Sequence, residues 1–502
     1  MSVASKVSRR LSETIAPEVI EHIYGPRLAG EMIATFPLFG ALNAAHLVML
    51  ARQGILTPAQ ATTIAGGLLR IADEGPEGID ADPALEDAYF NIEARLVELV
   101  GADAGGRLHI ARSRNDLSAA ADRLRARDIL LDLLDGAAKV RRTFIERGRE
   151  FAEVVMPGYT HLQPAQPITF GYYLTGLASA LERDAERLLD LWKRLNISPM
   201  GAAALATTTF PIDRALTAEL LGFDGVLEHG LDCVASRDFS LELIAAAAQM
   251  SLTLSRFAED MHVFVTYEFS SVEFPDSVCG TSSIMPQKKN PVVLEHLKGK
   301  AAHVVAAFGS AGACIRASHF TNTLDAHREG QAMIWPGLAE AQRALALAGI
   351  AAATVQPKTE LLLDRARKNF STATDLADAL VRFAGMDFRT AHHVAGAVVR
   401  RLMDAGLRAD EADVALVDAA CMEVAGRPGG LDADQIAQAL DPVRGVTART
   451  VTGGTAPVEV RRMADRMALR LAEDVARVAV WRTRLVTSAA RRTDALRELA
   501  AG

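Results

Sequence analysis

Aromatic residues and cysteines are scarce in this sequence. Only 5% of the 502 residues are Phe, Trp or Tyr, and because aromatic side chains favour strands, their scarcity disfavours β-sheet. The four cysteines, at positions 233, 279, 314 and 421, form no CxxC pair and have no zinc-ligand spacing. We therefore expect reduced thiols in a cytoplasmic protein, with no metal and no other cofactor.

Blocks of like charge and long apolar runs are also missing. The 54 Lys and Arg against 62 Asp and Glu give a net charge of −8 without a basic block, so we predict no nucleic-acid partner and no anionic membrane surface. The longest apolar run, Ala344 to Val355, is shorter than the roughly 20 residues that cross a bilayer. The N-terminus carries early charge without the apolar core of a secretory signal.

Long helices are predicted in the middle of the chain. No proline lies between Pro83 and Pro157, and apolar residues recur there with the spacing of one helix face. They are Leu117, Ala121, Leu124, Leu131, Leu134, Ala138 and Ile145. The stretches 237–268 and 291–314 also lack interior proline. Together these patterns predict an all-α protein built around a bundle of long helices.

The sequence changes character twice. Residues 1–110 hold short helical segments punctuated by Gly- and Pro-rich turns, and after Lys358 the segments become short and amphipathic again, broken by glycines. We predict three helical domains, with the long bundle in the middle: 1–110, 111–360 and 361–502.

Three turn-rich segments hold residues suited to chemistry. Residues 111–116 (ARSRND) open the first long helix, where a polar N-cap is common. Thr160 and His161 lie in a loop, where a lone histidine is more often a surface hydrogen-bonder than a catalyst. Residues 280–291 place hydroxyl groups and two lysines before a helix start, which suits binding of an anion. Each alone is unremarkable, but together they indicate a site.

These segments resemble a known family. GTSSIMPQKKNP (280–291) resembles the signature of the fumarase/aspartase superfamily, and SRND and GYTHLQPAQP are similar to the argininosuccinate lyase branch. Similar motifs are FPIDR (210–214), ASRDF (235–239), NFSTATDLAD (369–378) and GGTAP (453–457), so the resemblance covers roughly residues 85–460. The spacings of 45 residues from Asn115 to Thr160 and 122 from Thr160 to Ser282 also match that branch.

The resemblance implies an all-α homotetramer whose central domains pack into one large helical bundle. It implies that each active site combines the three segments from three different subunits. It also implies a reversible anti-elimination, in which an N-substituted aspartate loses its Cβ proton and then its amine, leaving fumarate.

Catalytic roles follow from the resemblance and from the chemistry. By superfamily alignment Ser282 is the base, and its alkoxide needs stabilisation by Lys288, by backbone amides and by exclusion of water. Lys288 and Asn290 are the donors expected to stabilise the doubly charged aci-carboxylate. His161 is the expected proton carrier for the leaving amine, with Glu295 holding its ring, although an acid at a helix start is also common for electrostatic reasons.

Substrate-binding residues are assigned in the same way. Ser113, Asn115 and Thr160 are expected to hydrogen-bond the substrate carboxylates, while Arg112 and Arg114 supply positive potential. Met285 and Asn290, from the signature, complete the aspartyl side of the predicted site.

The sequence departs from the family where the amine of the substrate is expected. Val292 replaces a usual Asp, and an ungapped count from Ser282 places Asn322, His327 and Gly330 where the family has Tyr, Gln and Lys. Tyr89 stands where the branch commonly has His. A guanidinium needs carboxylates and amide oxygens around it, so these changes argue against arginine as the amine, and Asn322 and His327 are predicted to bind the group that replaces it.

We therefore predict a fumarate-forming carbon–nitrogen lyase acting on an N-substituted aspartate, with an aminopolycarboxylate of the ethylenediamine-disuccinate type as one candidate substrate. One alternative is argininosuccinate lyase proper with a tolerant site. Another is a catalytically silent structural homologue of the lens-crystallin kind, although retention of Ser282, His161, Lys288 and Asn290 argues against silence.

Overall fold

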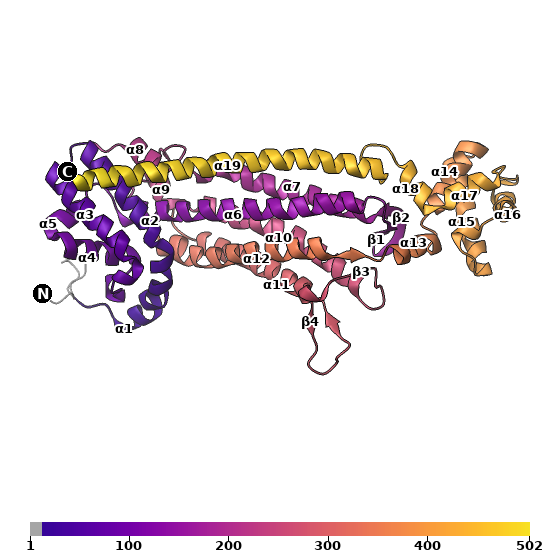
Figure 1. The fold of residues 1–502 in the computed structure, drawn as a ribbon, viewed down its shortest axis with the longest axis horizontal. Helices are drawn as coiled ribbons and strands as arrows, with labels where there is room; N and C mark the ends of the chain where they lie inside the picture. The colour runs from indigo at the N-terminus through magenta and orange to yellow at the C-terminus, as the bar shows by residue number, and fades with distance from the viewer. Residues whose placement is uncertain (1–12) are drawn as a thin grey trace.

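The fold is elongated and almost entirely helical, which confirms the all-α prediction. A computed structural model of the protein describes residues 13–502. One end holds the helices of residues 17–107, long parallel and antiparallel helices form the middle, and a group of short helices forms the other end (Figure 1). The prediction of only short helices in residues 1–110 is wrong, because α2 (Gly25–Arg52) has 28 residues.

The central bundle confirms the predicted long helices. It contains α6 (Arg114–Glu150), α7 (Phe170–Leu195), α10 (Asp238–Val265), α11 (Val292–Ile315) and α12 (Gly330–Thr354). On α6, the predicted apolar face is buried except for Ala138, which is half-buried. Each leucine removed from water on this face contributes about 1.5–3 kcal/mol. The bundle is therefore stabilised by the pattern from which it was predicted.

The N-terminal end has its own apolar core. Its elements are α1 (Pro17–Val19), the π-helical turn η1 (Ile20–Tyr24), α2 (Gly25–Arg52), α3 (Pro58–Glu74), η2 (Pro76–Gly78), η3 (Pro83–Leu85), α4 (Ala88–Val100) and α5 (Ala102–Arg107). Leu42, Leu47 and Ile64 are fully buried in this core. The short helix α8 (Arg214–Leu220) and the end of the C-terminal helix also pack there.

One helical segment is long and apolar enough to cross a membrane by length and composition. It is Pro17–Arg52, and 56% of its most apolar 18-residue window is buried inside the protein. The segment is not an uninterrupted apolar run in the sequence, because it contains polar residues such as Asn43 and His46. Both residues are buried, and His46 Nε2 lies 2.8 Å from the carbonyl oxygen of Ile110. These contacts are typical of a core helix, and the absence of a membrane partner stays a prediction.

The C-terminal end is a second small helical unit. It contains α13 (Thr359–Lys368), α14 (Ala373–Ala384), α15 (Phe388–Ala405), η6 (Ala409–Glu411), α16 (Val414–Ala425), α17 (Ala433–Leu440) and α18 (Pro442–Ala448). Leu380, Val394 and Cys421 are among its fully buried residues. All four cysteines are free thiols.

The last helix, α19 (Pro457–Ala501), leaves this unit and runs back along α6 and α7 to the N-terminal end (Figure 1). Trp481 of α19 stacks on Trp192 of α7 with 4.2 Å between ring centroids. Arg141 of α6 is buried and donates to Asp474 of α19 at 2.7 Å. The division at residues 110 and 360 stays a proposal, and we propose that the third domain ends before α19.

Three short antiparallel strand pairs occur within residues 13–502, two of them in segments predicted as turn-rich loops. They are β1 (Val155–Thr160) with β2 (Gln163–Thr169), β3 (Val272–Glu273) with β6 (Gln356–Pro357), and β4 (Gly280–Thr281) with β5 (Lys289–Asn290). The remaining short elements are α9 (Gly230–Ala235), η4 (Asp276–Val278) and the π-helical turn η5 (Asp325–Glu329). Two of the strand pairs carry predicted catalytic residues.

Candidate active site

The three predicted segments lie at separate places within one chain. Asn115 lies in the first turn of α6, and Thr160 follows the far end of that helix. At about 1.5 Å per residue, the 37 residues of α6 span roughly 55 Å. The loop between β4 and β5, with Ser282, projects from the side of the bundle (Figure 1). One chain therefore does not bring the three segments together.

A capping box begins α6. The Ser113 hydroxyl accepts from the backbone N–H of Asn115 at 3.3 Å, and the Asp116 carboxylate accepts from the backbone N–H of Ser113 at 2.9 Å. These bonds satisfy donors that have no partner inside the helix. The Ser113 side chain is thus already engaged with the backbone in this structure.

The Asn115 side chain has a defined orientation. Its Nδ2 donates to the carbonyl oxygen of Ala204 at 2.9 Å, and its Oδ1 accepts from Asn322 Nδ2 at 2.9 Å. Since an amide carries two N–H donors, one remains on Asn115. The structure thus brings together two predicted substrate-binding residues, Asn115 and Asn322.

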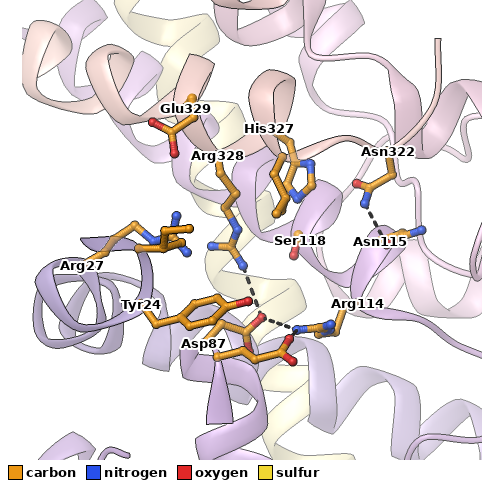
Figure 2. Close-up of a pocket in the computed structure, with 13 residues that line it drawn as sticks. Tyr24, Arg27, Asp87, Arg114, Asn115, Ser118, Asn322, His327, Arg328 and Glu329 are labelled. Carbon is orange, nitrogen blue, oxygen red and sulfur yellow. Dashed lines mark hydrogen bonds and ion pairs between the residues drawn. The ribbon is translucent and has the colours of Figure 1, made fainter. Parts of the chain in front are cut away.

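Both asparagines line a cavity of about 130 Å³ (Figure 2). Its wall combines η1 and α2 of the N-terminal end, the residues before α4, the start of α6 and the turn η5. Predicted residues that line it are Arg114, Asn115, Asn322 and His327. The cavity is the part of the predicted site that one chain builds by itself.

An alternating chain of ion pairs surrounds the cavity. Its members, in order, are Arg27, Glu31, Arg328, Asp87, Arg114 and Glu86. Arg114 Nη1 lies 2.8 Å from Glu86 and 3.1 Å from Asp87, and Arg328 pairs with Glu31 and with Asp87 at 3.3 Å. Three cations therefore face three carboxylates, so the positive potential predicted for Arg114 is offset by its neighbours.

Arg328 is held in this chain rather than directed to solvent. Burial by itself would lower its pKa, but Glu31 and Asp87 outweigh that effect and raise the pKa. Figure 2 shows its guanidinium above Asp87, between Arg27 and the start of α6.

His327 is a neutral group in the cavity wall. Burial, together with Arg237 and Arg328, lowers its pKa to about 3. Its Nδ1 lies 2.5 Å from the carbonyl oxygen of Thr323. Because a carbonyl only accepts, the neutral ring carries its proton on Nδ1, which leaves Nε2 as an acceptor.

Arg112 does not line the cavity. It is buried, and its Nη2 donates to the Tyr89 hydroxyl at 3.1 Å, while Nε and Nη1 have no hydrogen-bond partner among residues 13–502. Tyr89 is also buried and donates to Glu93 at 2.9 Å. Both side chains belong to a polar network of the N-terminal end, so the guanidinium of Arg112 is not among the groups that line the cavity.

Thr160 and His161 lie at the tip of the β1–β2 hairpin. Thr160 pairs with Gln163, so His161 and Leu162 form the two-residue turn, with φ of 53° and 58°. Positive φ is unfavourable for such side chains, at about 1–3 kcal/mol each, and such strain often accompanies function. Both predicted residues are exposed, as is Leu162 at 76%. The tip thus presents His161 away from its own chain.

The hairpin is supported at its base. Val155 of β1 is buried with Ala366 of α13 and Val446 of α18. The C-terminal unit therefore packs on the hairpin that carries His161.

The signature loop is exposed at its tip. The Ser282 hydroxyl accepts from the backbone N–H of Met285 at 3.0 Å, and Asn290 Nδ2 donates to the carbonyl oxygen of Thr281 at 3.3 Å. Met285 and Lys288 are exposed. Within the described part of the chain, no hydrogen bond or ion pair joins Ser282 to Lys288.

Glu295 is exposed in the first turn of α11, directly after this loop in the sequence. His161 lies at the tip of the β1–β2 hairpin, and within residues 13–502 no hydrogen bond or ion pair joins the two side chains, so the predicted pair is not formed within one chain.

Comparisons with known proteins decide the family. Residues 27–306 match the family model described as "Lyase", and residues 370–447 match "Argininosuccinate lyase C-terminal". Argininosuccinate lyase 1 of Shouchella clausii is 39% identical over 465 residues, which cover 93% of each chain. The chain belongs to the argininosuccinate lyase branch of the fumarase/aspartase superfamily. It is a carbon–nitrogen lyase.

Solved structures agree with this assignment. EDDS lyase in complex with formate superposes on this lyase with a TM-score of 0.88 at 32% identity, covering 98% of this chain and 97% of that one. An EDDS lyase variant with bound fumarate gives a TM-score of 0.87, also at 32% identity and with the same coverage.

Two of the five positions at which the sequence is predicted to depart from its branch line the cavity. Asn322 and His327 line it, whereas Val292 and Gly330 are not among its lining residues. A side chain at Gly280 would meet Val292 at 2.8 Å, and Gly330 is buried against Ile315. Among these positions, Asn322 and His327 line the cavity of one chain, and their role toward the amine stays a prediction.

Sequence reasoning missed several members of the cavity wall. Tyr24, Arg27, Glu86 and Asp87 line it, and only the acid pair before a helix start gave any local signal. The ion pairs of Arg328 with Glu31 and Asp87 join distant parts of the chain, so no spacing along the sequence indicates them.

Proposed function

We propose that this lyase catalyses the reversible release of fumarate from an N-substituted aspartate whose amine is not arginine. The observation that carries the proposal is the presence of Asn322 and a neutral His327 in the cavity wall. Two of the carboxylates that also line it, Glu86 and Asp87, are already paired with Arg114 and Arg328. The third, Glu329, is exposed and forms no ion pair within residues 13–502. A guanidinium binding at Glu86 or Asp87 would have to compete with those arginines, at a cost in desolvation.

The proposed chemistry uses the exposed segments. Ser282 removes the Cβ proton of the substrate, while Lys288 and Asn290 stabilise the charge that develops on the adjacent carboxylate. His161, oriented by Glu295, carries a proton to the leaving amine. These groups lie at loop tips in one chain, and exclusion of water would require them to be covered.

The carboxylates of the substrate are assigned to a second set of groups. We propose that Ser113, Asn115 and Thr160 hydrogen-bond them, with Met285 packing beside them. Asn115 has an amide hydrogen left for this role.

We propose a homotetramer in which three subunits contribute to each site. α11 supports it: Gly299, Ala302, Ala306, Gly309 and Ala313 form an exposed row with steps of 3 and 4 residues. A side chain at Gly299 or Gly309 would meet nothing within 4 Å in one chain. Small residues with this spacing allow another helix to approach closely, so this face suits packing between copies.

A specific experiment tests the proposed function. The protein is incubated with fumarate and a panel of amines, including ethylenediamine, arginine and ammonia, and the adducts are identified by mass. We expect an N-substituted aspartate from at least one amine other than arginine, and none with Ser282→Ala as the matched control. An adduct formed only with arginine would contradict the proposal.

Argininosuccinate lyase proper is the second candidate, favoured by the 37–39% identity to proteins with that name. The silent structural alternative is not proposed, because the relatives that the chain matches are lyases and the predicted catalytic residues are present. The cytoplasmic location stays a prediction.

A further inference from the structure

The loop of residues 198–211 is a turn-rich segment to which the proposed chemistry gives no role, yet it contacts the candidate site. Its residue Ala204 supplies the carbonyl oxygen that accepts from Asn115 Nδ2. Because a carbonyl only accepts, this contact determines which end of the Asn115 amide is the nitrogen. Asn115 Oδ1 then faces Asn322, which must present its own Nδ2. The orientation of two cavity amides thus depends on the position of one backbone carbonyl.

Asp116 is the side chain that holds this loop. It is fully buried, and its Oδ2 accepts from the backbone N–H groups of Gly201 at 3.0 Å and Ala203 at 2.9 Å. Its Oδ1 accepts from the backbone N–H of Ser113 at 2.9 Å. One carboxylate therefore joins the start of α6 to the loop through three hydrogen bonds.

The loop adopts a conformation that needs such support. Gly201 has φ of +84°, which suits glycine, but Ala203 has φ of 51°, which is unfavourable for a residue with a Cβ. Strained backbone of this kind persists only where surrounding contacts impose it. The two N–H groups bound by Asp116 are those of Gly201 and Ala203 themselves, the residues with positive φ, directly before Ala204.

We infer that Asp116 is a positioning residue for substrate binding: it fixes the loop at Ala204, and thereby the amide orientation with which Asn115 meets a substrate carboxylate. The inference rests on the proposed function, in which Asn115 binds that carboxylate. Asp116 does not touch the substrate. It affects substrate binding only through the loop and the Asn115 amide.

Asp116→Asn tests the inference with almost no change in volume. An amide has an acceptor on one side only, so its NH₂ group must face either the N–H of Ser113 or the N–H groups of the loop. We expect the Kd for fumarate, measured by calorimetry on the purified protein, to rise at least tenfold. Asp432→Asn is the matched control, because Asp432 forms a capping box at α17 in the C-terminal unit, and its Kd should stay within twofold of wild type.

A double-variant comparison separates positioning from a general loss of stability. If Asp116 acts through Asn115, then Asp116→Asn combined with Asn115→Ala should bind fumarate about as weakly as Asn115→Ala alone. Two results would overturn the inference. One is a double variant whose fumarate Kd rises by the product of the two single-variant increases. The other is a fumarate Kd within twofold of wild type in folded Asp116→Asn.

Gly201→Ala disturbs the loop without changing Asp116, and serves if Asp116→Asn does not fold. Its Cβ would lie 2.7 Å from Arg214 Cγ and 2.9 Å from Ile212 Cδ1, at a positive φ. We expect a similar rise in the Kd, and an unchanged Kd would overturn the inference. Failure of the wild-type protein to bind fumarate would instead contradict the proposed function, and this inference with it.

Discussion

Asn115 lies in the first turn of α6, and Thr160 lies one short strand beyond the last turn of the same helix. The two residues are thus separated by roughly the 55 Å length of that helix, yet the proposed chemistry needs both at one substrate. Different copies of the chain must then supply them.

Complementation between inactive subunits tests this requirement. Mixing Ser282→Ala with His161→Asn after dissociation and reassembly should restore activity, because some sites then receive both intact groups. The measurement is fumarate release, with each variant reassembled alone as the control. No recovery in tetramers confirmed as mixed by mass would mean that each site is built within one chain.

Ser282→Ala should abolish turnover and leave assembly and substrate binding nearly intact. Ser282 is half-buried and lies outside the core, and among residues 13–502 its hydroxyl accepts hydrogen bonds only from the backbone N–H groups of Ile284 and Met285 in its own loop. Steady-state kinetics and fumarate binding separate the two effects. More than about a tenth of the wild-type kcat, a change under ~1.4 kcal/mol in the barrier, would remove Ser282 as the base.

Argininosuccinate should be a poor substrate. Asn322 and His327 stand where polar partners of the arginine are expected, and two lost contacts at ~1–3 kcal/mol each lower kcat/KM by some orders of magnitude. His327→Gln should recover part of that activity, since it restores the residue typical of the branch. A wild-type kcat/KM on argininosuccinate above about 10⁴ M⁻¹s⁻¹, ordinary for a native substrate, would favour argininosuccinate lyase proper.

Acid should destabilise the protein through His46. Burial lowers the pKa of His46 to about 3, so between pH 6.5 and 3 the unfolded chain binds a proton that the folded chain does not. Its contribution to stability is present above pH 6.5 and is lost as the pH falls, at about 1.4 kcal/mol per pH unit. Asp116, whose pKa burial raises to about 6, has the opposite effect between pH 6 and 3.8.

A variant without this histidine separates the effect of His46 on stability from that of Asp116. Urea unfolding of His46→Gln between pH 6 and 4 should show a slope smaller than that of wild type by about 1.4 kcal/mol per pH unit. His392→Gln is the control, because His392 is exposed and its imidazole is hydrated in both states. Equal slopes for wild type and His46→Gln would show that His46 is not the group responsible.

The sequence predicted best what depends on local pattern. The apolar spacing on α6 indicated a helix and its buried face, because helix geometry repeats every few residues. The β1–β2 hairpin was not predicted, because its turn residues, His161 and Leu162, are not the Gly or Asn typical of such turns.

The return of α19 and most of the cavity wall were not predictable in this way. Trp481 meets Trp192, and Arg328 meets Asp87, across separations of hundreds of residues. No periodicity encodes such pairs. The resemblance assigned Val292, Asn322, His327 and Gly330 to the amine of the substrate, and of these Asn322 and His327 line the cavity of one chain. Their role in binding the amine stays a prediction.

The end of α19 lies beside α2 and α3 (Figure 1). Ala495 and Leu496 complete the apolar core that includes Leu28, Met32 and Phe39 of α2. During synthesis, the apolar residues of α2 therefore emerge from the ribosome long before the α19 residues that cover them. A chain that ends before α19 leaves this part of the N-terminal core exposed to water, and exposed apolar surface of that kind favours aggregation.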